Sequence, residues 1–154
     1  MALERGDIAP DFTLLDQHAN PVTLSELRGK TVVLYFYPKA DTPGCTTQAC
    51  GVRDHRADYA NANTVVLGVS PDPVKPILKF DEKYGLGFPL LSDEDHAVAE
   101  AYGVWVEKNR YGRTYMGNER TTFVVGEDGT VREVFRSVKP ADHDELVLGA
   151  LAGP

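Results

Sequence analysis

Residues 31–45 read TVVLYFYPKADTPGC, and this stretch decides how the rest of the chain folds. After Thr31 the run to residue 37 is apolar, and its side chains are β-branched, aromatic or leucine. A continuous run of this kind lacks the alternation of a half-exposed strand and is typical of a strand buried on both faces. We therefore predict a central strand over 31–37 that leads directly into a polar turn and a cysteine.

Helical and strand-like segments alternate on both sides of this stretch. The pattern predicts two short strands within 12–24, a helical turn over 24–29, a buried strand over 64–70, and a short strand over 88–93. It predicts a hairpin over 121–135, where two β-rich runs flank Asp128-Gly129. Helices are expected over 46–60, 72–85, 94–103 and 139–151, several of them closed by a glycine.

Two of these helices have apolar side chains at helical spacing. In 72–85 these are Val74, Ile77, Leu78 and Tyr84, with Gly85 as the stop signal. In the last helix, Leu146, Leu148 and Leu151 are expected to face the core in part.

Strands that alternate with helices, together with one antiparallel hairpin, indicate an α/β fold with a mixed central β-sheet flanked by helices. The length of 154 residues favours a single domain over 1–154. In such sheets ligands bind at the carboxyl ends of the strands. The segment after strand 31–37 therefore lies where a functional site is expected.

Composition excludes several classes of function. The chain is 42% hydrophobic and 25% charged, as in soluble globular proteins. Its net charge of −7, from 16 basic and 23 acidic residues, argues against nucleic-acid binding. No stretch is apolar for long enough to span a membrane, and the first residues lack the pattern of a secretory signal. We expect a cytoplasmic protein, in whose reducing surroundings a cysteine pair is more often catalytic or redox-sensing than structural.

Cys45 and Cys50 are the only cysteines, and the residues before the first one favour its ionisation. Thr42 is a candidate N-cap, Pro43 then takes the first helical position, and Gly44 lets the backbone approach other groups closely. Cys45 falls in the first helical turn, where free backbone N–H groups and the helix dipole favour an anion. Since the thiolate is the nucleophilic form of cysteine, this placement predicts a reactive sulfur.

The spacing of the two cysteines predicts a conformational change. Residues five apart in an α-helix have Cα atoms about 8.6 Å apart, on different sides of the helix. A disulfide requires at most about 6.8 Å. If both cysteines are helical, the helix must unwind in part before they can bond. We hypothesise that Cys45 is oxidised first and that Cys50 then attacks its sulfur.

Other interpretations of these residues stay open at this stage. Buried free cysteines are common as small apolar side chains. A zinc site is poorly supported, because the four histidines are scattered and none has ligand spacing. Asp54 and His55 are expected on a solvated helix face. Trp105 and Tyr115 are candidates for lining a site, although core or rim packing explains them as well.

The segment FYPKADTPGCTTQAC, residues 36–50, resembles the active-site pattern of the peroxiredoxins, in which Pro, Thr or Ser, and Cys recur at fixed spacing. The second cysteine five residues later resembles the bacterioferritin comigratory protein branch, also called peroxiredoxin Q. The likeness also covers GDIAPDFTLLDQ, LSELRGKTVVLYFYPK and YMGNERTTFVVGEDGTV, and so runs over nearly the whole chain. It implies a thioredoxin-like fold.

The resemblance also implies a role for each residue that matches the pattern. Cys45 would be the peroxidatic nucleophile that becomes a sulfenic acid, and Cys50 the resolving cysteine that forms an intramolecular disulfide with it. Thr42 would offer its hydroxyl to the thiolate and the peroxide, and Pro38 would shield the site from water. Arg120 would stabilise the thiolate and the charge that develops on the leaving oxygen.

The implied function is a thiol peroxidase for hydrogen peroxide and organic hydroperoxides, active in antioxidant defence and redox homeostasis. It would use no metal, haem or flavin. Thioredoxin or a similar dithiol would recycle it, and a monomer is expected. Gln48 stands where the family often has Glu, so a neutral side chain replaces a carboxylate at this position. Two rival functions remain: a thiol–disulfide oxidoreductase acting on proteins, which the absence of Cys-x-x-Cys disfavours, and a redox sensor or chaperone-like binder.

Overall fold

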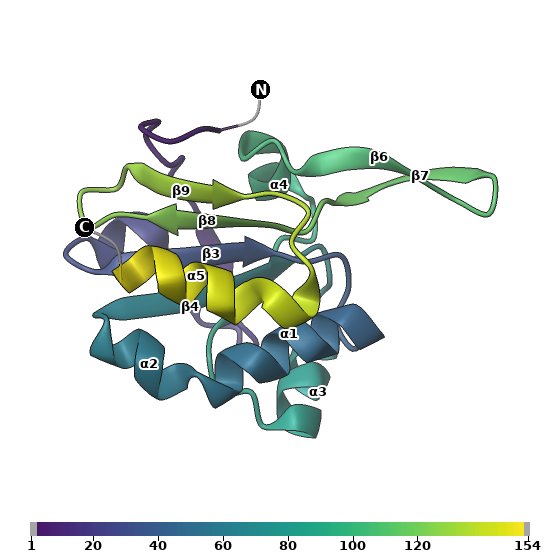
Figure 1. The fold of residues 1–154 in the computed structure, drawn as a ribbon. Coiled ribbons are helices and arrows are strands. Elements are labelled where there is room, and N and C mark those ends of the chain that lie inside the picture. Colours follow the sequence, from purple (N-terminus) through teal and green to yellow (C-terminus); the bar gives the residue numbers. More distant parts are fainter. Residues whose placement is uncertain (1–2, 153–154) are drawn as a thin grey trace.

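The computed structural model of the protein describes residues 3–152. A seven-stranded mixed sheet forms its centre (Figure 1). Across the sheet the strands are β2 (Pro21–Thr23), β1 (Thr13–Leu15), β5 (Leu90–Ser92), β4 (Thr64–Ser70), β3 (Thr31–Phe36), β8 (Thr121–Val125) and β9 (Val131–Phe135). Strands β3, β4 and β5 are parallel, and the other pairings are antiparallel. The predicted mixed sheet flanked by helices is confirmed.

Helices cover both faces of this sheet. One face carries α1 (Pro43–Asp54), α2 (Arg56–Asn61), α3 (Val74–Tyr84) and α5 (His143–Ala152), which is preceded by the 3-10 turn η2 (Pro140–Asp142). The other face carries α4 (Ala97–Ala101) and the 3-10 turn η1 (Leu24–Leu27). Figure 1 shows α1 and α5 side by side across the first face.

Strand β3 is the hub of both cores, as its sequence predicts. Every residue of the strand is buried. Val32, Leu34 and Phe36 belong to the core beneath α4, whereas Val33 and Tyr35 belong to the core beneath α1, α3 and α5. A strand whose successive side chains enter two different cores must be apolar throughout, which explains its unbroken run.

A second, two-stranded sheet projects from the body of the protein and was not predicted from the sequence (Figure 1). It consists of β6 (Trp105–Arg110) and β7 (Arg113–Asn118), joined by Tyr111 and Gly112, both of which have positive φ. Two such residues form the tight turn that suits hairpins, but a tyrosine at the first position is not its usual sequence signal. Most of the hairpin is polar and exposed, so it also lacks the alternation that marks a strand.

The helix boundaries differ from the predictions in detail. The helix expected over 46–60, with its first turn predicted from Pro43, does begin at Pro43 but is divided at His55 into α1 and α2. Gly85 closes α3 as predicted, in a left-handed conformation with φ 58°. In α5 the prediction for Leu146 is wrong: its side chain is exposed, and Val147 is the residue fully buried in the core. Leu148 and Leu151 pack partly against the core as expected.

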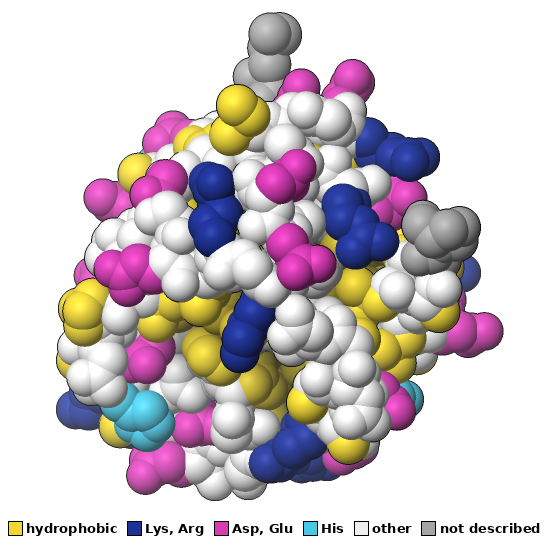
Figure 2. Space-filling view, turned by 90° about the vertical axis from the view of Figure 1, so that its left-hand side faces the viewer, with side chains coloured by type: hydrophobic (Ala, Val, Ile, Leu, Met, Phe, Trp, Pro, Cys, Tyr) yellow, Lys and Arg dark blue, Asp and Glu magenta, His cyan; other side chains and the backbone are white. Residues whose placement is uncertain are grey.

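The distribution of charge on the surface agrees with the expectation that the protein does not bind nucleic acid. Figure 2 shows the face opposite the projecting hairpin, where basic side chains stand singly and acidic ones lie among them. A continuous basic stripe, the usual mark of a nucleic-acid interface, is not seen on this face. Among residues 3–152, no helix has both the length and the apolar character that crossing a bilayer requires.

A substitution at Gly68 tests the packing of the central strands. A Cβ at this position of β4 would lie 2.9 Å from the ring and hydroxyl of Tyr35 and 3.0 Å from Leu90. Because these neighbours are fully buried, we expect Gly68→Ala to lower the free energy of unfolding by about 1–3 kcal/mol, as overpacking does. Urea-induced unfolding measures the change.

Gly149→Ala is the matched control. Gly149 is an exposed residue of α5 with open space around it, so the same substitution should stabilise the protein by about 0.5–1 kcal/mol. Equal effects at the two positions would contradict the packing of Tyr35 against Gly68.

Candidate active site

Two carboxylates fix the loop between β3 and α1 near its end. The Asp72 carboxylate accepts a hydrogen bond from the backbone N–H of Ala40 (2.7 Å). Asp41, which has a positive φ of 60°, binds Lys83 (3.0 Å) and the Tyr84 hydroxyl (2.9 Å) at the end of α3. These contacts set the direction in which the chain enters α1.

The first turn of α1 has the geometry that the sequence predicts. Thr42 takes the N-cap position with extended backbone, Pro43 is the first helical residue, and Cys45 is therefore the third. One detail differs, because the Thr42 side chain does not cap the helix. Its hydroxyl donates instead to the Lys39 carbonyl (2.9 Å). The N–H groups of the first turn are left free to favour a negative charge at Cys45.

Arg120 reaches this turn from a segment distant in sequence. It lies directly before β8, and its backbone carbonyl accepts a hydrogen bond from the N–H of Val138 (3.0 Å). Its Nη2 donates to the sulfur of Cys45 (3.4 Å), and its Nη1 donates to the Gln48 side-chain oxygen (2.7 Å). The structure thus brings Cys45 and Arg120 together and adds Gln48, one helical turn after the cysteine.

Gly44 makes this approach possible. A Cβ at Gly44 would lie 3.1 Å from Nη2 of Arg120 and 3.3 Å from Cγ of Pro140. Contacts this short are rare for a real Cβ, so a larger residue would push the guanidinium away from the sulfur. The small size of Gly44 therefore leaves room for the Arg120 side chain as well as for the close approach of the backbone.

Lys108 is a second cation near the sulfur. This half-buried residue of β6 has its side chain alongside Gly117. Its pKa is lowered, mainly by burial and then by repulsion from Arg120, whereas the negative charge of Cys45 acts in the opposite direction. Lys108 was not predicted from the sequence, since nothing there distinguishes it from the other charged residues of the hairpin.

Cys50 occupies a different side of α1. Cys45 is fully buried, whereas Cys50 is half-buried, and both thiols are free. Cys50 lines a groove of about 670 Å³ between α1 and the segment 140–145, which also includes Thr47, Gly51, His55, Pro140 and Asp144. With both cysteines inside one unbroken helix, the ideal separation of about 8.6 Å between their Cα atoms applies.

The remaining candidates lie at the edge of this arrangement. Pro38 is half-buried and follows Tyr37, whose carbonyl accepts a hydrogen bond from the Asn118 side chain (3.1 Å). Trp105 stacks on His96, with ring centroids 4.1 Å apart, while Tyr115 is 46% exposed on the hairpin. Both are therefore explained by packing or by position on the rim.

The expectation of a solvated face at Asp54 and His55 is correct only for Asp54. The His55 ring is half-buried, and its Nδ1 lies 2.9 Å from the Gly51 carbonyl. This contact and the charge of Asp144 raise the pKa of His55, against the effect of its burial.

The arrangement equips one sulfur to act as a nucleophile. A helix amino terminus and a guanidinium surround Cys45, and the same guanidinium can stabilise negative charge on an oxygen that leaves a bond under attack. In residues 3–152, no three His, Cys, Asp or Glu side chains are grouped so that they could hold a metal ion. The site has the features of a thiol-based peroxidase.

Comparison with known proteins gives the same result. Residues 5–134 match the AhpC/TSA family. The chain is 48% identical to peroxiredoxin Bcp of Escherichia coli over 149 residues (97% of this chain, 96% of the relative). It is 47% identical to peroxiredoxin Bcp of Bacillus subtilis over 151 residues (98% and 96%).

Solved structures agree with these relatives. Peroxidoxin BcpB of Mycobacterium tuberculosis superposes with a TM-score of 0.87 at 39% identity (97% of this chain, 96% of that chain). A Xanthomonas campestris bacterioferritin comigratory protein, described for its alkyl peroxide reduction activity, gives a TM-score of 0.89 at 38% identity (96% and 97%).

The chain therefore belongs to the AhpC/TSA family, and its relatives in that family are peroxiredoxins of the Bcp and peroxiredoxin Q type. It is an enzyme, a peroxidase with the thioredoxin-like fold that the sequence predicted.

Gln48→Leu tests how the guanidinium is held. The substitution keeps a similar volume but removes the acceptor for Nη1 of Arg120. Hydrogen bonds to charged groups contribute about 1.5–3 kcal/mol, so the oxidation of Cys45 by hydrogen peroxide should slow roughly tenfold or more. Rapid-mixing measurements of the first turnover give this rate.

The control for this variant is Thr47→Ala, which removes an exposed hydroxyl from the same helix. Its oxidation rate should match that of the unmodified protein. A Gln48→Leu protein that reacts as fast as this control would show that Gln48 does not hold Arg120 in its reactive position.

Proposed function

We propose that this protein reduces hydrogen peroxide and organic hydroperoxides through Cys45. The observation that carries this proposal is the 3.4 Å hydrogen bond from Arg120 to the Cys45 sulfur in the first turn of α1. The thiolate attacks one peroxide oxygen and the O–O bond breaks. The sulfur becomes a sulfenic acid, and the second oxygen leaves as hydroxide or alkoxide and takes up a proton. Arg120 lies where it can stabilise the charge on that oxygen.

Substrate binding requires a small local adjustment. The Thr42 hydroxyl donates to the Lys39 carbonyl and must rotate before it can donate to a peroxide. Pro38 stands at the end of β3, where its ring can limit the entry of water. Organic hydroperoxides are included because the Xanthomonas campestris relative is described as reducing alkyl peroxides.

Cys50 completes the cycle in this proposal. Its thiol attacks the sulfenic acid of Cys45, so that an S–S bond forms, the S–O bond breaks and water leaves. The two cysteines are too far apart for this reaction within an ideal helix, so α1 must unwind between them. A dithiol protein such as thioredoxin then exchanges with the disulfide and restores both thiols while it is itself oxidised.

The remaining features follow from the same chemistry. Because the proposed disulfide is intramolecular, one chain suffices for a full cycle, and we propose that the protein acts as a monomer. A cycle that depends on a reduced dithiol partner suits the cytoplasm. Antioxidant defence and redox homeostasis would be the corresponding roles.

Substitution of each cysteine separates the two steps. With NADPH, thioredoxin and thioredoxin reductase present, Cys45→Ser should show no peroxide turnover, because the nucleophile is lost. Cys50→Ser should react once and then accumulate a sulfenic acid that a dimedone-type reagent traps. NADPH consumption and intact-protein mass measure the two outcomes.

The rival functions predict different results in the same assay. If Cys45→Ser consumed peroxide at the unmodified rate, Cys45 would not be the nucleophile. Disulfide exchange with protein substrates in the absence of any peroxide consumption would favour a thiol–disulfide oxidoreductase. Binding of unfolded client proteins only after oxidation, alongside normal peroxide kinetics, would add a chaperone-like role.

Arg120→Ala tests the electrostatic part of the proposal. Loss of one such donor typically costs about 10²–10³ in rate, so oxidation of Cys45 should slow by that factor. An unchanged rate of Cys45 oxidation would remove Arg120 from the site.

A further inference from the structure

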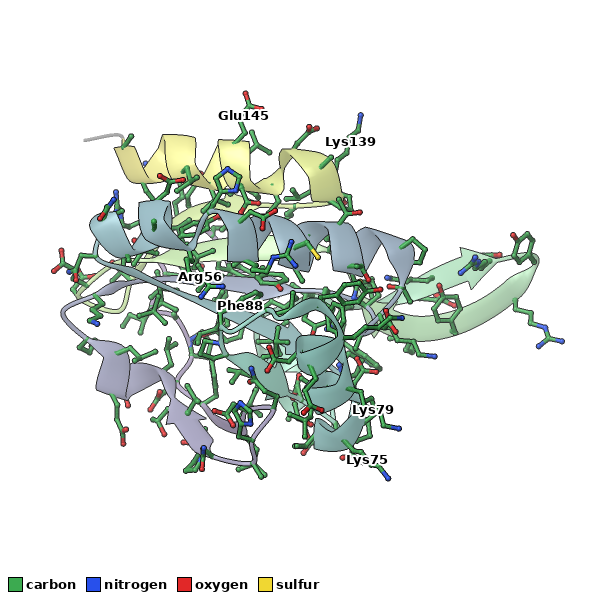
Figure 3. The ribbon with its side chains drawn as sticks, turned by 90° about the horizontal axis from the view of Figure 1, so that it is seen from below. Arg56, Lys75, Lys79, Phe88, Lys139 and Glu145 are labelled. Carbon is green, nitrogen blue, oxygen red and sulfur yellow. The ribbon has the colours of Figure 1, made fainter. Side chains whose placement is uncertain are left out.

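A buried carboxylate on α5 contacts the helix that carries both cysteines. Figures 1 and 3 show α5 lying alongside α1. The Asp144 side chain, at the start of α5, is nine-tenths buried in this contact. The neighbouring Glu145 is exposed, and in Figure 3 its side chain points away from α1. Glu145 lies at the exposed rim of the groove beside Cys50, whereas Asp144 is the carboxylate that is buried against α1.

The Asp144 carboxylate is fitted against Gly51. A Cβ at Gly51 would lie closer to the carboxylate oxygen Oδ2 than real Cβ atoms ever lie to a neighbouring atom. The absence of a side chain at Gly51 therefore creates the notch that the carboxylate occupies. This notch immediately follows Cys50 in the sequence.

The same carboxylate is bound by the next helix. The hydroxyl of Tyr59, a buried residue of α2, donates a hydrogen bond to Oδ1 of Asp144. Burial, and next the hydrogen bond to Asp144, raise the pKa of Tyr59 well above its usual value, so the hydroxyl keeps its proton. His55, between the two helices, places its Nδ1 3.7 Å from Oδ2 of Asp144. One carboxylate thus connects α1, α2 and the residue between them.

On its far side Asp144 lies beside the buried ring of His143, whose Nδ1 makes no hydrogen bond within the described residues. Nδ1 of His143 lies 3.6 Å from Oδ1 of Asp144, and Nε2 of the same ring is 3.0 Å from the Thr122 hydroxyl on β8. Since β8 is an interior strand of the sheet, the His143 ring beside the carboxylate is bound to a well-supported part of the protein.

These contacts are placed selectively along the chain. Gly51, His55 and Tyr59 all follow Cys50, while Cys45 and Gln48 contact Arg120 instead. For a disulfide, the Cα separation must fall from about 8.6 Å in a helix to about 6.8 Å or less. Unwinding of the residues between the cysteines is enough for that change, and nothing after Cys50 has to move.

We propose that Asp144 is a positioning residue for the resolving step. It anchors the chain directly after Cys50, so that the unwinding of α1 stops there. With this end fixed, Cys50 stays near the place to which the oxidised Cys45 returns, and the effective concentration of its thiol stays high. When Cys50 attacks the sulfenic acid, the S–S bond forms, the S–O bond breaks and water leaves. Asp144 touches neither sulfur in this step and acts only through Gly51 and Tyr59.

The test separates the peroxide step from the resolving step. Reduced protein is mixed with one equivalent of hydrogen peroxide, quenched at intervals and analysed by mass for the thiol, sulfenic acid and disulfide forms. In Asp144→Ala we expect disulfide formation to slow roughly tenfold, because Cys50 loses its fixed position. Oxidation of Cys45 should stay within about twofold of the unmodified rate, because Arg120 and Gln48 are untouched.

Two further variants complete this comparison. Tyr59→Phe keeps the buried ring and removes only the hydroxyl, so it should slow disulfide formation in the same direction but by less. Glu145→Gln changes the adjacent exposed carboxylate and should leave both rates unchanged. An Asp144→Ala protein with an unchanged resolving rate, or with both rates lowered equally, would overturn the role of Asp144.

Hydrogen exchange locates the boundary of unwinding directly. In the disulfide form of the unmodified protein, backbone amides over 55–61, whose acceptors lie at Gly51 or later, should remain protected, while those over 46–54 lose protection. In oxidised Asp144→Ala, the loss should extend beyond 54. Loss of protection over 55–61 in the oxidised unmodified protein would show that no anchor exists at this position.

A double-substitution cycle tests the contact with Gly51. Gly51→Ala alone should slow disulfide formation, because its methyl group displaces the carboxylate. In the Asp144→Ala background the same methyl fills vacated space, so little further slowing is expected. The added helix propensity of alanine is common to both backgrounds and cancels. Slowing factors that simply multiply would show that the two positions act independently.

Because this role of Asp144 rests on the proposed function of Cys50, the unmodified protein is the internal reference. If it forms no disulfide between Cys45 and Cys50 after peroxide treatment, the proposed function of Cys50 fails, and the role of Asp144 with it. If the disulfide forms at the same rate in all the variants, only the role of Asp144 fails.

Discussion

The contact between the Arg120 guanidinium and the Cys45 sulfur is the constraint on which the rest of the site depends. It is a product of sheet topology. Strand β8 runs antiparallel to β3, with Thr121 opposite Phe36, so the residue before β8 lies at the carboxyl end of β3. The chain that leaves β3 at that same end turns into α1 and delivers Cys45. Two segments 75 residues apart in sequence therefore meet because the interior strands β3 and β8 are paired in one register.

A guanidinium and a sulfur anion in a buried place need partners on every side. Arg120 is oriented by Gln48, and Gly44 leaves the space through which it approaches. The free N–H groups of the first turn of α1 complete the surroundings of the sulfur. Lys108 adds positive charge from the hairpin. A chain of net charge −7 thus concentrates positive potential at one cysteine, which is how a local field can differ from the average of the molecule.

Much of this was predictable from the sequence, and the reasons for the rest are physical. The run 31–37 specified the central strand because both its faces are buried, and the Thr-Pro-Gly lead-in specified the start of α1 because each residue has a strong local preference. Arg120 was found only through its resemblance to a family motif, since a single arginine carries no local signal. The β6–β7 hairpin was missed because it packs few apolar side chains. Asp144 was missed because a buried carboxylate is recognisable only from its partners, and Gly51 and Tyr59 are more than 80 residues away in sequence.

Only 1% of the surface of Cys45 is exposed. The burial of its sulfur has a consequence for chemistry other than peroxide reduction. A thiolate held ready for attack would, on an open surface, also be alkylated by the bulky electrophiles of metabolism. Buried in the first turn of α1 and beside the Arg120 guanidinium, the sulfur is accessible only to small or slender reagents, so the enclosure selects reagents by size. In the proposed mechanism, the packing that shelters Cys45 from side reactions is the same packing that prepares it for peroxide.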